Sequence, residues 1–205
     1  SANGTSAPAV VRVLVGQPIT LGLPGGRNDT GQTVCTDSTG VAIACAALTS
    51  HPGQDGRFGR DAQAGAAAFD HMADSGCVHD RVTGLTWSAD TLAPRTWVQA
   101  NSASDSRCGI ATGWRLPTRR ELLTLVHHGA SNPAIATAAF PGTHSAPYWS
   151  SDTQGSQAWA VDFSDGGTRR IAQAESHAAR LVALPANQAP AITLGADIVL
   201  SNNER

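Results

Sequence analysis

The stretch Gly113-Trp114-Arg115-Leu116-Pro117-Thr118-Arg119-Arg120-Glu121-Leu122-Leu123 says more about the fold than any other part of the sequence. Thr118 is followed three residues later by Glu121, the spacing of a capping box, in which each side chain satisfies a backbone N–H at the start of a helix. Pro117 lies directly before the cap and stops the helix from extending backwards. The pattern predicts a helix over residues 119 to 127 or 128.

Short strands are predicted on both sides of this helix. Residues 158–163 alternate large apolar side chains with small or polar ones, which is the period of a strand. Asp165-Gly166-Gly167 is a typical turn, so residues 169–171 should return as the partner strand. Further strands are expected at 82–87, 148–151 and 180–184, and a second helix at 96–102. This mixture indicates an α+β domain with short antiparallel strands and two helices.

The cysteines Cys35, Cys45, Cys77 and Cys108 form two local pairs, and neither pair has the Cys-x-x-Cys spacing of a zinc or redox site. Two disulfides are the simplest interpretation, and four buried thiols are the alternative. Cys35 with Cys45 would close a short hairpin-like loop and Cys77 with Cys108 a longer one, each contributing about 2–4 kcal/mol. Disulfides require an oxidising compartment, so we expect a secreted protein.

The composition restricts the class of protein. The formal net charge is −2, which does not favour an electrostatic nucleic-acid binder, and no apolar run is long enough to span a bilayer. All 14 basic residues are arginines, and with the abundant Ala and Gly this fits a GC-rich bacterial genome. The chain starts at Ser1, as expected of a mature product after signal cleavage or of a trimmed chain.

Four segments are expected along the chain. Residues 1–26 form a β-prone arm, 27–66 a loop-rich lobe held by the first cysteine pair, 67–185 the main domain, and 186–205 a linker and strand. The last segment is similar to the start of the Ig-like repeats of large bacterial surface proteins.

A set of short motifs in residues 77–184 carries a family resemblance. In chain order the main ones are Cys77-Val78-His79-Asp80, Thr83-Gly84-Leu85-Thr86-Trp87, Thr96-Trp97, Gly113-Trp114-Arg115-Leu116-Pro117-Thr118 with Glu121, Phe140-Pro141, Tyr148-Trp149-Ser150-Ser151 and Ala158 to Phe163. The ordered set resembles the family of the C-terminal domain of the Legionella collagen-like adhesin, also known as DUF1566, and covers about half of the chain.

The resemblance implies a C-type-lectin-like fold and a role in adhesion or recognition. It also supports pairing Cys77 with Cys108, because Leu181 stands where some members of the family have a further cysteine. It gives a structural role to Trp87, Trp97, Trp114, Arg115, Thr118, Glu121 and Trp149. Arg115 is expected to be buried and paired with an acid.

The candidate ligand-binding residues lie in the second half of the domain. They are Tyr148, Asp152, Gln157, Trp159, Arg169, Arg170 and His177. Aromatic faces can stack on sugars, and arginines form bidentate bonds with sulfate or carboxylate groups. An exposed polar hairpin without a ligand is the alternative.

Catalysis and metal chemistry find little support in the sequence. The motif at 115–118 also resembles the formylglycine-generating enzymes, but these need a reactive cysteine pair late in the domain, and no cysteine follows Cys108. His127 and His128 are adjacent, and adjacent side chains on a helix point about 100° apart, so they do not suit one metal ion. We expect no enzyme, no resident metal and no cofactor, although residues 53–61 could hold a structural calcium ion.

The favoured function is an extracellular recognition or adhesion module whose partner is a glycan or another cell-surface ligand. The alternative is a structural subunit of an extracellular, pilus-like filament, in which the β-prone arms pair with neighbouring copies.

Overall fold

The computed structural model describes residues 28–49, 51–62 and 67–184. The expected arms at 1–26 and 186–205 lie outside the described residues, and so does any strand pairing that they would make. Residues 28–62 are called the lobe below, and residues 67–184 the domain.

The lobe contains little regular structure, as the sequence predicted. Its elements are β1 (Cys35–Thr36), β2 (Ala42–Ile43), the 3-10 helices η1 (Cys45–Ala47) and η2 (Arg60–Ala62), and α1 (Asp55–Phe58). β1 and β2 pair antiparallel, with Cys35 opposite Ile43, and the disulfide Cys35–Cys45 closes the predicted hairpin-like loop. Among its described side chains, the buried hydrophobic ones are Cys35 and Leu48.

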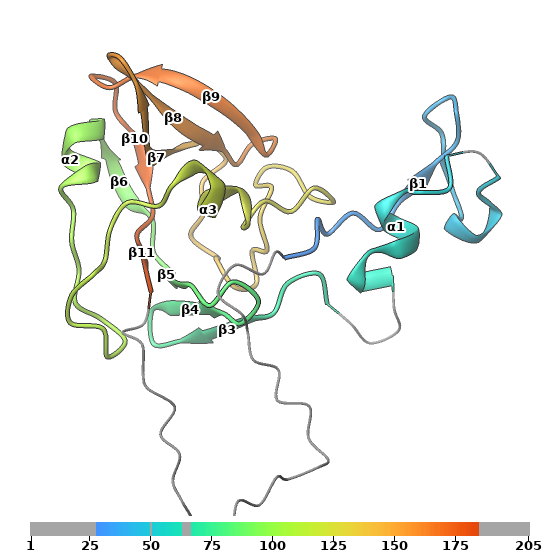
Figure 1. The fold of residues 1–205 in the computed structure, drawn as a ribbon, viewed down its shortest axis with the longest axis horizontal. Helices are drawn as coiled ribbons and strands as arrows, with labels where there is room; N and C mark the ends of the chain where they lie inside the picture. Colours follow the sequence, from blue (N-terminus) through green and yellow to red (C-terminus); the bar gives the residue numbers. More distant parts are fainter. Residues whose placement is uncertain (1–27, 50, 63–66, 185–205) are drawn as a thin grey trace, which may run out of the picture. The chain divides into compact units, whose positions relative to one another are not determined.

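The domain has two sheets, drawn in Figure 1. The four-stranded sheet has the order β11-β5-β4-β3 and the five-stranded sheet the order β6-β10-β7-β8-β9. Their strands are β3 (His71–Asp74), β4 (Cys77–Asp80), β5 (Thr86–Ser88), β6 (Leu92–Arg95), β7 (Pro147–Gln154), β8 (Gln157–Asp162), β9 (Gly167–Ala172), β10 (His177–Ala179) and β11 (Val182–Ala183). All pairs are antiparallel except β10 with β7, which is parallel and departs from the prediction.

Two predicted strands are shorter than expected, each for a local reason. Residues 81–83 form a turn, because the buried Asp80 carboxylate accepts hydrogen bonds from the amides of Val82 and Thr83. Only residues 86–88 then pair as β5. At the other end of the domain, the prediction of one strand over 180–184 is wrong, because the chain changes sheets between β10 and β11.

Both predicted helices of the domain begin at capping boxes. α2 (Trp97–Asn101) is capped by Thr96 with Gln99, and α3 (Arg119–Leu123) by Thr118 with Glu121. α3 ends earlier than predicted, because the next amides bond three residues back and Val126 then bridges to Ile135. The structure is therefore α+β, with more strand than helix in the domain.

The core is divided into three clusters that meet around the two sheets. The largest contains Trp87, Leu122, Phe140, Tyr148 and Phe163, the second is built on Trp149, and the third surrounds Trp114 and Cys77. Trp87, Trp114 and Trp149 are buried and Trp97 is partly buried. In the described part of the chain, no helix is long and apolar enough to cross a membrane.

Candidate functional site

One face of the β7–β8–β9 sheet gathers an aromatic ring and two arginines. Trp159 in β8 is only partly buried and lies directly opposite Arg170 of β9. The guanidinium of Arg119, the first residue of α3, lies 4.2 Å from the centre of the Trp159 ring, and that of Arg170 lies 5.6 Å from it. Both distances are in the range of cation–π contacts.

The position of Arg119 follows from the start of α3. The backbone N–H of Arg119 donates to the Asp152 carboxylate at 2.5 Å, so a strand residue caps the helix from outside. This bond joins the first turn of α3 to β7, and Figure 1 shows α3 beside these strands. The Arg119 side chain is thereby directed over β8 rather than into solvent.

Further polar side chains share this face. Gln154 accepts a hydrogen bond from Arg170 at 2.9 Å and lies opposite Gln157 across β7 and β8. Thr168 lies two residues before Arg170 on β9, and alternation along a strand puts both on one side. The name Trp159 face is used below for this set, which consists of Arg119, Gln154, Gln157, Trp159, Thr168 and Arg170.

The two arginines of the Trp159 face have no acidic partner among the described residues, unlike four other arginines of the domain. Arg81, Arg107, Arg115 and Arg169 each form an ion pair with an aspartate or glutamate. Within the described residues, Arg119 and Arg170 form none. Their positive charge is therefore available to a ligand.

Four of the seven predicted ligand-binding residues belong to this region. Gln157, Trp159 and Arg170 lie on the face itself, and Asp152 positions Arg119 from its edge. Arg119, Gln154 and Thr168 were missed, because only the tertiary structure brings α3 and β7 beside β8. The proximity of an arginine at a helix start to a tryptophan 40 residues later has no signal in the sequence.

The other three predicted ligand residues are placed elsewhere. Tyr148 is fully buried, its hydroxyl bonded to Thr91 at 2.8 Å and to the His144 amide at 2.9 Å, so the prediction that it contacts a ligand is wrong. The reason is that Tyr148 continues the apolar core of β7. His177 packs edge-on against Trp149, away from the Trp159 face.

Arg169 is held on the opposite face from Trp159 by two acids. Its guanidinium contacts Asp162 at 2.7 Å and Asp165 at 2.8 Å. Burial alone would raise the pKa of Asp162, but hydrogen bonds from Ser164 and Arg169 lower it overall. Arg169 thus stabilises the β8–β9 turn, and its charge is balanced within the domain.

The predicted role of Arg115 is correct in its partner and wrong in its burial. Arg115 forms two bonds with Glu121, at 2.6 and 2.8 Å, but its side chain is 43% exposed. The pair reinforces the capping box at the surface, since Glu121 also accepts from the Thr118 amide at 2.7 Å.

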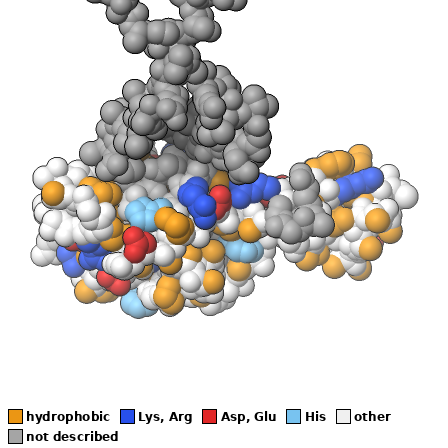
Figure 2. All heavy atoms as spheres, turned by 90° about the horizontal axis from the view of Figure 1, so that it is seen from below, with side chains coloured by type: hydrophobic (Ala, Val, Ile, Leu, Met, Phe, Trp, Pro, Cys, Tyr) orange, Lys and Arg blue, Asp and Glu red, His pale blue; other side chains and the backbone are white. Residues whose placement is uncertain are grey.

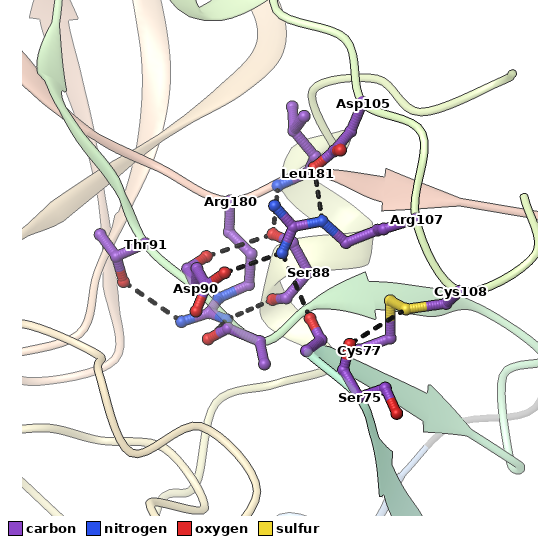
Figure 3. Close-up of polar contacts among 12 residues, drawn as sticks. Ser75, Cys77, Ser88, Asp90, Thr91, Asp105, Arg107, Cys108, Arg180 and Leu181 are labelled. Carbon is purple, nitrogen blue, oxygen red and sulfur yellow. Dashed lines mark hydrogen bonds and ion pairs between the residues drawn. A yellow bond between two sulfur atoms is a disulfide. The ribbon is translucent and has the colours of Figure 1, made fainter. Parts of the chain in front are cut away.

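The buried arginine of the domain is Arg180, which the sequence reasoning missed. Its side chain is fully buried and donates to the carbonyls of Ser88, labelled in Figure 3, and Ala89. It also donates to the Thr143 hydroxyl. It also lies 4.6 Å from the centre of the Phe140 ring. Burial lowers the pKa of Arg180 to about 10, so it is charged at neutral pH. The available signal was an arginine inside the otherwise apolar run 178–183.

The second disulfide, Cys77–Cys108, is formed as predicted. Next to it, Arg107 contacts Asp90 at 2.8 Å, Asp105 at 2.6 Å and the Gly76 carbonyl at 3.3 Å (Figure 3). The loop that carries Cys108 is thus bound to the four-stranded sheet by a covalent bond and by an ion-pair network.

The loop proposed for calcium contains neighbouring carboxylates. Asp29 accepts from the amides of Arg60 and Asp61, and Asp55 accepts from the Thr30 hydroxyl. Burial and the nearby charges of Asp29 and Asp55 raise the pKa of Asp61. In the residues that the structure covers, no group of three or more His, Cys, Asp or Glu side chains is arranged to hold a metal ion. Structural calcium stays a prediction.

Surface charges elsewhere are mixed. Among the described residues visible in Figure 2, basic, acidic and histidine side chains are interspersed with apolar ones.

These features define a disulfide-bonded α+β module with a polar, arginine-flanked sheet face. The family model of the Lcl C-terminal domain matches residues 76–183, more than half of the chain. The chain therefore belongs to this family, which confirms the resemblance found in the sequence. No curated protein matches the chain. The family indicates a domain of bacterial surface proteins, and with the two disulfides it is consistent with an extracellular protein.

Proposed function

We propose that this chain is an extracellular recognition module of a bacterial surface protein and that it binds a glycan through the Trp159 face. The observation that carries the proposal is a partly exposed tryptophan beside two arginines that have no acidic partner among the described residues. Aromatic rings offer an apolar surface to sugar C–H groups, and arginines recognise carboxylate or sulfate groups in a bidentate manner.

The arrangement favours an anionic glycan over a neutral one. Arg119 already lies over the Trp159 ring, so a neutral sugar would have to displace the guanidinium before it could stack. An acidic sugar would instead gain a charge-assisted hydrogen bond from that guanidinium. Gln154 and Gln157 would contribute neutral hydrogen-bonding groups at the edge of the same face.

A C-type-lectin-like fold is part of the proposal. It is supported by the family, by the two short capped helices, and by the pairing of the last strand, β11, with β5 near the start of the domain. This pairing brings the two ends of the domain together and leaves β7–β9 free to present a ligand surface.

The test is binding of the purified, oxidised chain to an array of neutral, carboxylated and sulfated oligosaccharides, followed by calorimetry on the best ligand. We expect binding to the anionic sugars only, and a loss of about tenfold in affinity, or about 1.4 kcal/mol, for Trp159→Ala or Arg119→Ala. Arg169→Gln, which changes a balanced arginine on the opposite face, is the matched control and should bind like the wild type. Absence of binding to every class, or equal affinity of Trp159→Ala and wild type, would refute the proposal.

The alternative of a filament subunit depends on residues 1–26 and 186–205, which lie outside the described part of the chain. It stays a prediction.

A further inference from the structure

The segment 28–31 is attached to the domain by partly buried polar contacts. The side-chain amide of Asn28 donates to Asp80 Oδ2 at 2.7 Å and to the Thr124 carbonyl at 3.3 Å. The His128 amide donates to the carbonyl of Thr30 at 2.7 Å. Two of these bonds reach the loop after α3, and the third reaches the end of β4.

The backbone of this segment also fits closely against the loop after α3. Gly31 has a φ of +74°, and a Cβ added there would lie 2.6 Å from Nδ1 of His127. A Cβ on Gly129 would overlap the Gly31 carbonyl oxygen. The attachment therefore depends on close approach between the backbone at Gly31 and residues 127–129. A small displacement of the hydrogen bond between Asn28 and Asp80 should be enough to disturb it.

The segment is anchored at Asp80, and each oxygen of the Asp80 carboxylate accepts two hydrogen bonds. Oδ1 accepts from the amides of Val82 and Thr83, at 2.9 and 3.2 Å. Oδ2 accepts from the Thr83 hydroxyl at 2.7 Å and from Asn28. Asp80 is 1% exposed, so its charge is stabilised by these donors rather than by bulk water.

A second donor for Asp80 Oδ2 lies within reach but unbonded. Nε2 of His71 is 3.9 Å from that oxygen, and the His71 side chain is only 3% exposed. The imidazole packs between the rings of Phe69 and Phe140, each 5.3 Å away centre to centre. Neither ring nitrogen has a hydrogen-bond partner among the described residues. Burial lowers the pKa of His71, so the ring is neutral at neutral pH.

Few other charges face this histidine. The neighbouring Asp70 forms an ion pair with Arg81 at 3.1 Å. The ring of His127 packs against Phe69 rather than against His71 itself. Phe140, whose ring packs edge-on against His71, carries no charge, and neither does Asn28, which donates to the same Asp80 oxygen. A proton on His71 would therefore be stabilised mainly by Asp80.

We propose that His71 is a proton-sensitive latch for the segment 28–31. When the imidazole takes up a proton from solvent, its Nε2–H turns to Asp80 Oδ2, because a hydrogen bond between two opposite charges is stronger than the bond that the uncharged Asn28 amide donates to the same carboxylate. The Asn28 amide then loses the shorter of its two bonds and keeps only the long one to the Thr124 carbonyl, so the segment separates from the loop after α3. Mild acid would thus detach the segment 28–31 from the domain while the domain itself stays folded.

The sign of the pH dependence follows from linkage. A histidine whose pKa is lower in the latched state than when released binds more protons in the released state. The latch is therefore fully closed above the ordinary histidine pKa and weakens as the pH falls below it. Each pKa unit between the two states corresponds to roughly tenfold in the latching equilibrium.

The experiment is hydrogen exchange of individual amides by NMR between pH 7.5 and 5, corrected for the intrinsic pH dependence of exchange. The His128 amide, which reports the bond to Thr30, should lose about tenfold or more of its protection at pH 5. The Val182 amide, which donates to the Arg115 carbonyl at 2.9 Å inside the domain, is the internal reference and should keep its protection. The pH midpoint of the loss of protection at the His128 backbone amide should match the midpoint at which the His71 ring titrates.

Two variants separate the latch from general acid sensitivity. His71→Phe fills the same aromatic site without a titrating group and should make protection of the His128 amide independent of pH. His51→Gln, at an exposed position of the lobe, should behave like the wild type. Unchanged protection of His128 in the wild type, or the same loss in His71→Phe, would overturn the proposal. If His71→Phe does not fold, a mismatch of the two wild-type midpoints would overturn it equally.

Discussion

The lobe and the domain of this chain are stabilised in different ways. The lobe has one disulfide and two described buried hydrophobic side chains, and leaves Val34, Val41 and Phe58 at least half exposed. The domain has three core clusters, and its disulfide lies at the edge of one of them. In the lobe the covalent bond replaces a core, whereas in the domain it supplements one.

Within the domain, a buried and an exposed arginine also differ in how they stabilise the fold. Arg180, directly after β10, is buried and bonds to Ala89 after β5 and to Thr143, whereas Arg115 pairs with Glu121 of the α3 cap at the surface. A buried cation satisfies groups that water cannot reach, so its loss leaves them unbonded. An exposed ion pair competes with solvent and contributes far less.

The largest effect is expected from Arg180→Met. Methionine fills much of the space of the arginine side chain but has no N–H group. The buried carbonyls of Ser88 and Ala89 therefore lose their hydrogen-bond donor. We expect the free energy of unfolding to fall by about 3 kcal/mol or more. Urea unfolding followed by tryptophan fluorescence measures this. Arg170→Met, at an exposed position, should change it by no more than about 0.5 kcal/mol, and a similarly small effect of Arg180→Met would show that the core does not depend on this residue.

Removal of each disulfide tests the two regions separately. Cys77→Ser with Cys108→Ser should lower the stability of the domain by about 3–4 kcal/mol, because the bond closes a loop with a sequence separation of 31. Cys35→Ser with Cys45→Ser should leave the unfolding of the domain unchanged within about 0.5 kcal/mol but make residues 35–45 a site of rapid proteolysis. Equal destabilisation of the domain by both pairs would mean that the lobe and the domain unfold as one unit.

Local patterns in the sequence predicted the local features of this structure well. The capping box at Thr118 and Glu121, the turn at Asp165-Gly166, and the strands 158–163 and 169–171 all depend on contacts between near neighbours in the chain. The disulfides followed from the number and spacing of the cysteines and from the family resemblance. Such features carry their cause within a few residues.

Long-range features were not predictable in the same way. Tyr148 was expected to meet a ligand and is core, whereas Arg119 was not considered and lies over Trp159. Arg180 was overlooked because nothing near it in sequence shows that carbonyls about 90 residues earlier need its guanidinium. The candidate site depends on which face of a strand another element covers, and a single sequence does not record that choice.

The smallest expected effect is at the surface ion pair of the domain. Burial alone would raise the pKa of Glu121, but hydrogen bonds from Arg115 and from the Thr118 amide lower it below its ordinary value of 4.5. A carboxylate with a lowered pKa stabilises the fold above its unfolded value and loses that contribution as the pH falls through its folded value. Because the Arg115 side chain is 43% exposed, solvent screening limits the stability lost in Glu121→Gln to about 1 kcal/mol at pH 7. This difference should decrease as the pH falls through the lowered pKa of Glu121. Urea unfolding of the wild type and of Glu121→Gln, from pH 7 downwards, measures this difference in stability. Arg115→Met serves as the partner variant in a double-mutant cycle. A loss as large as that of Arg180→Met would remove the distinction between buried and exposed arginines on which the comparison depends.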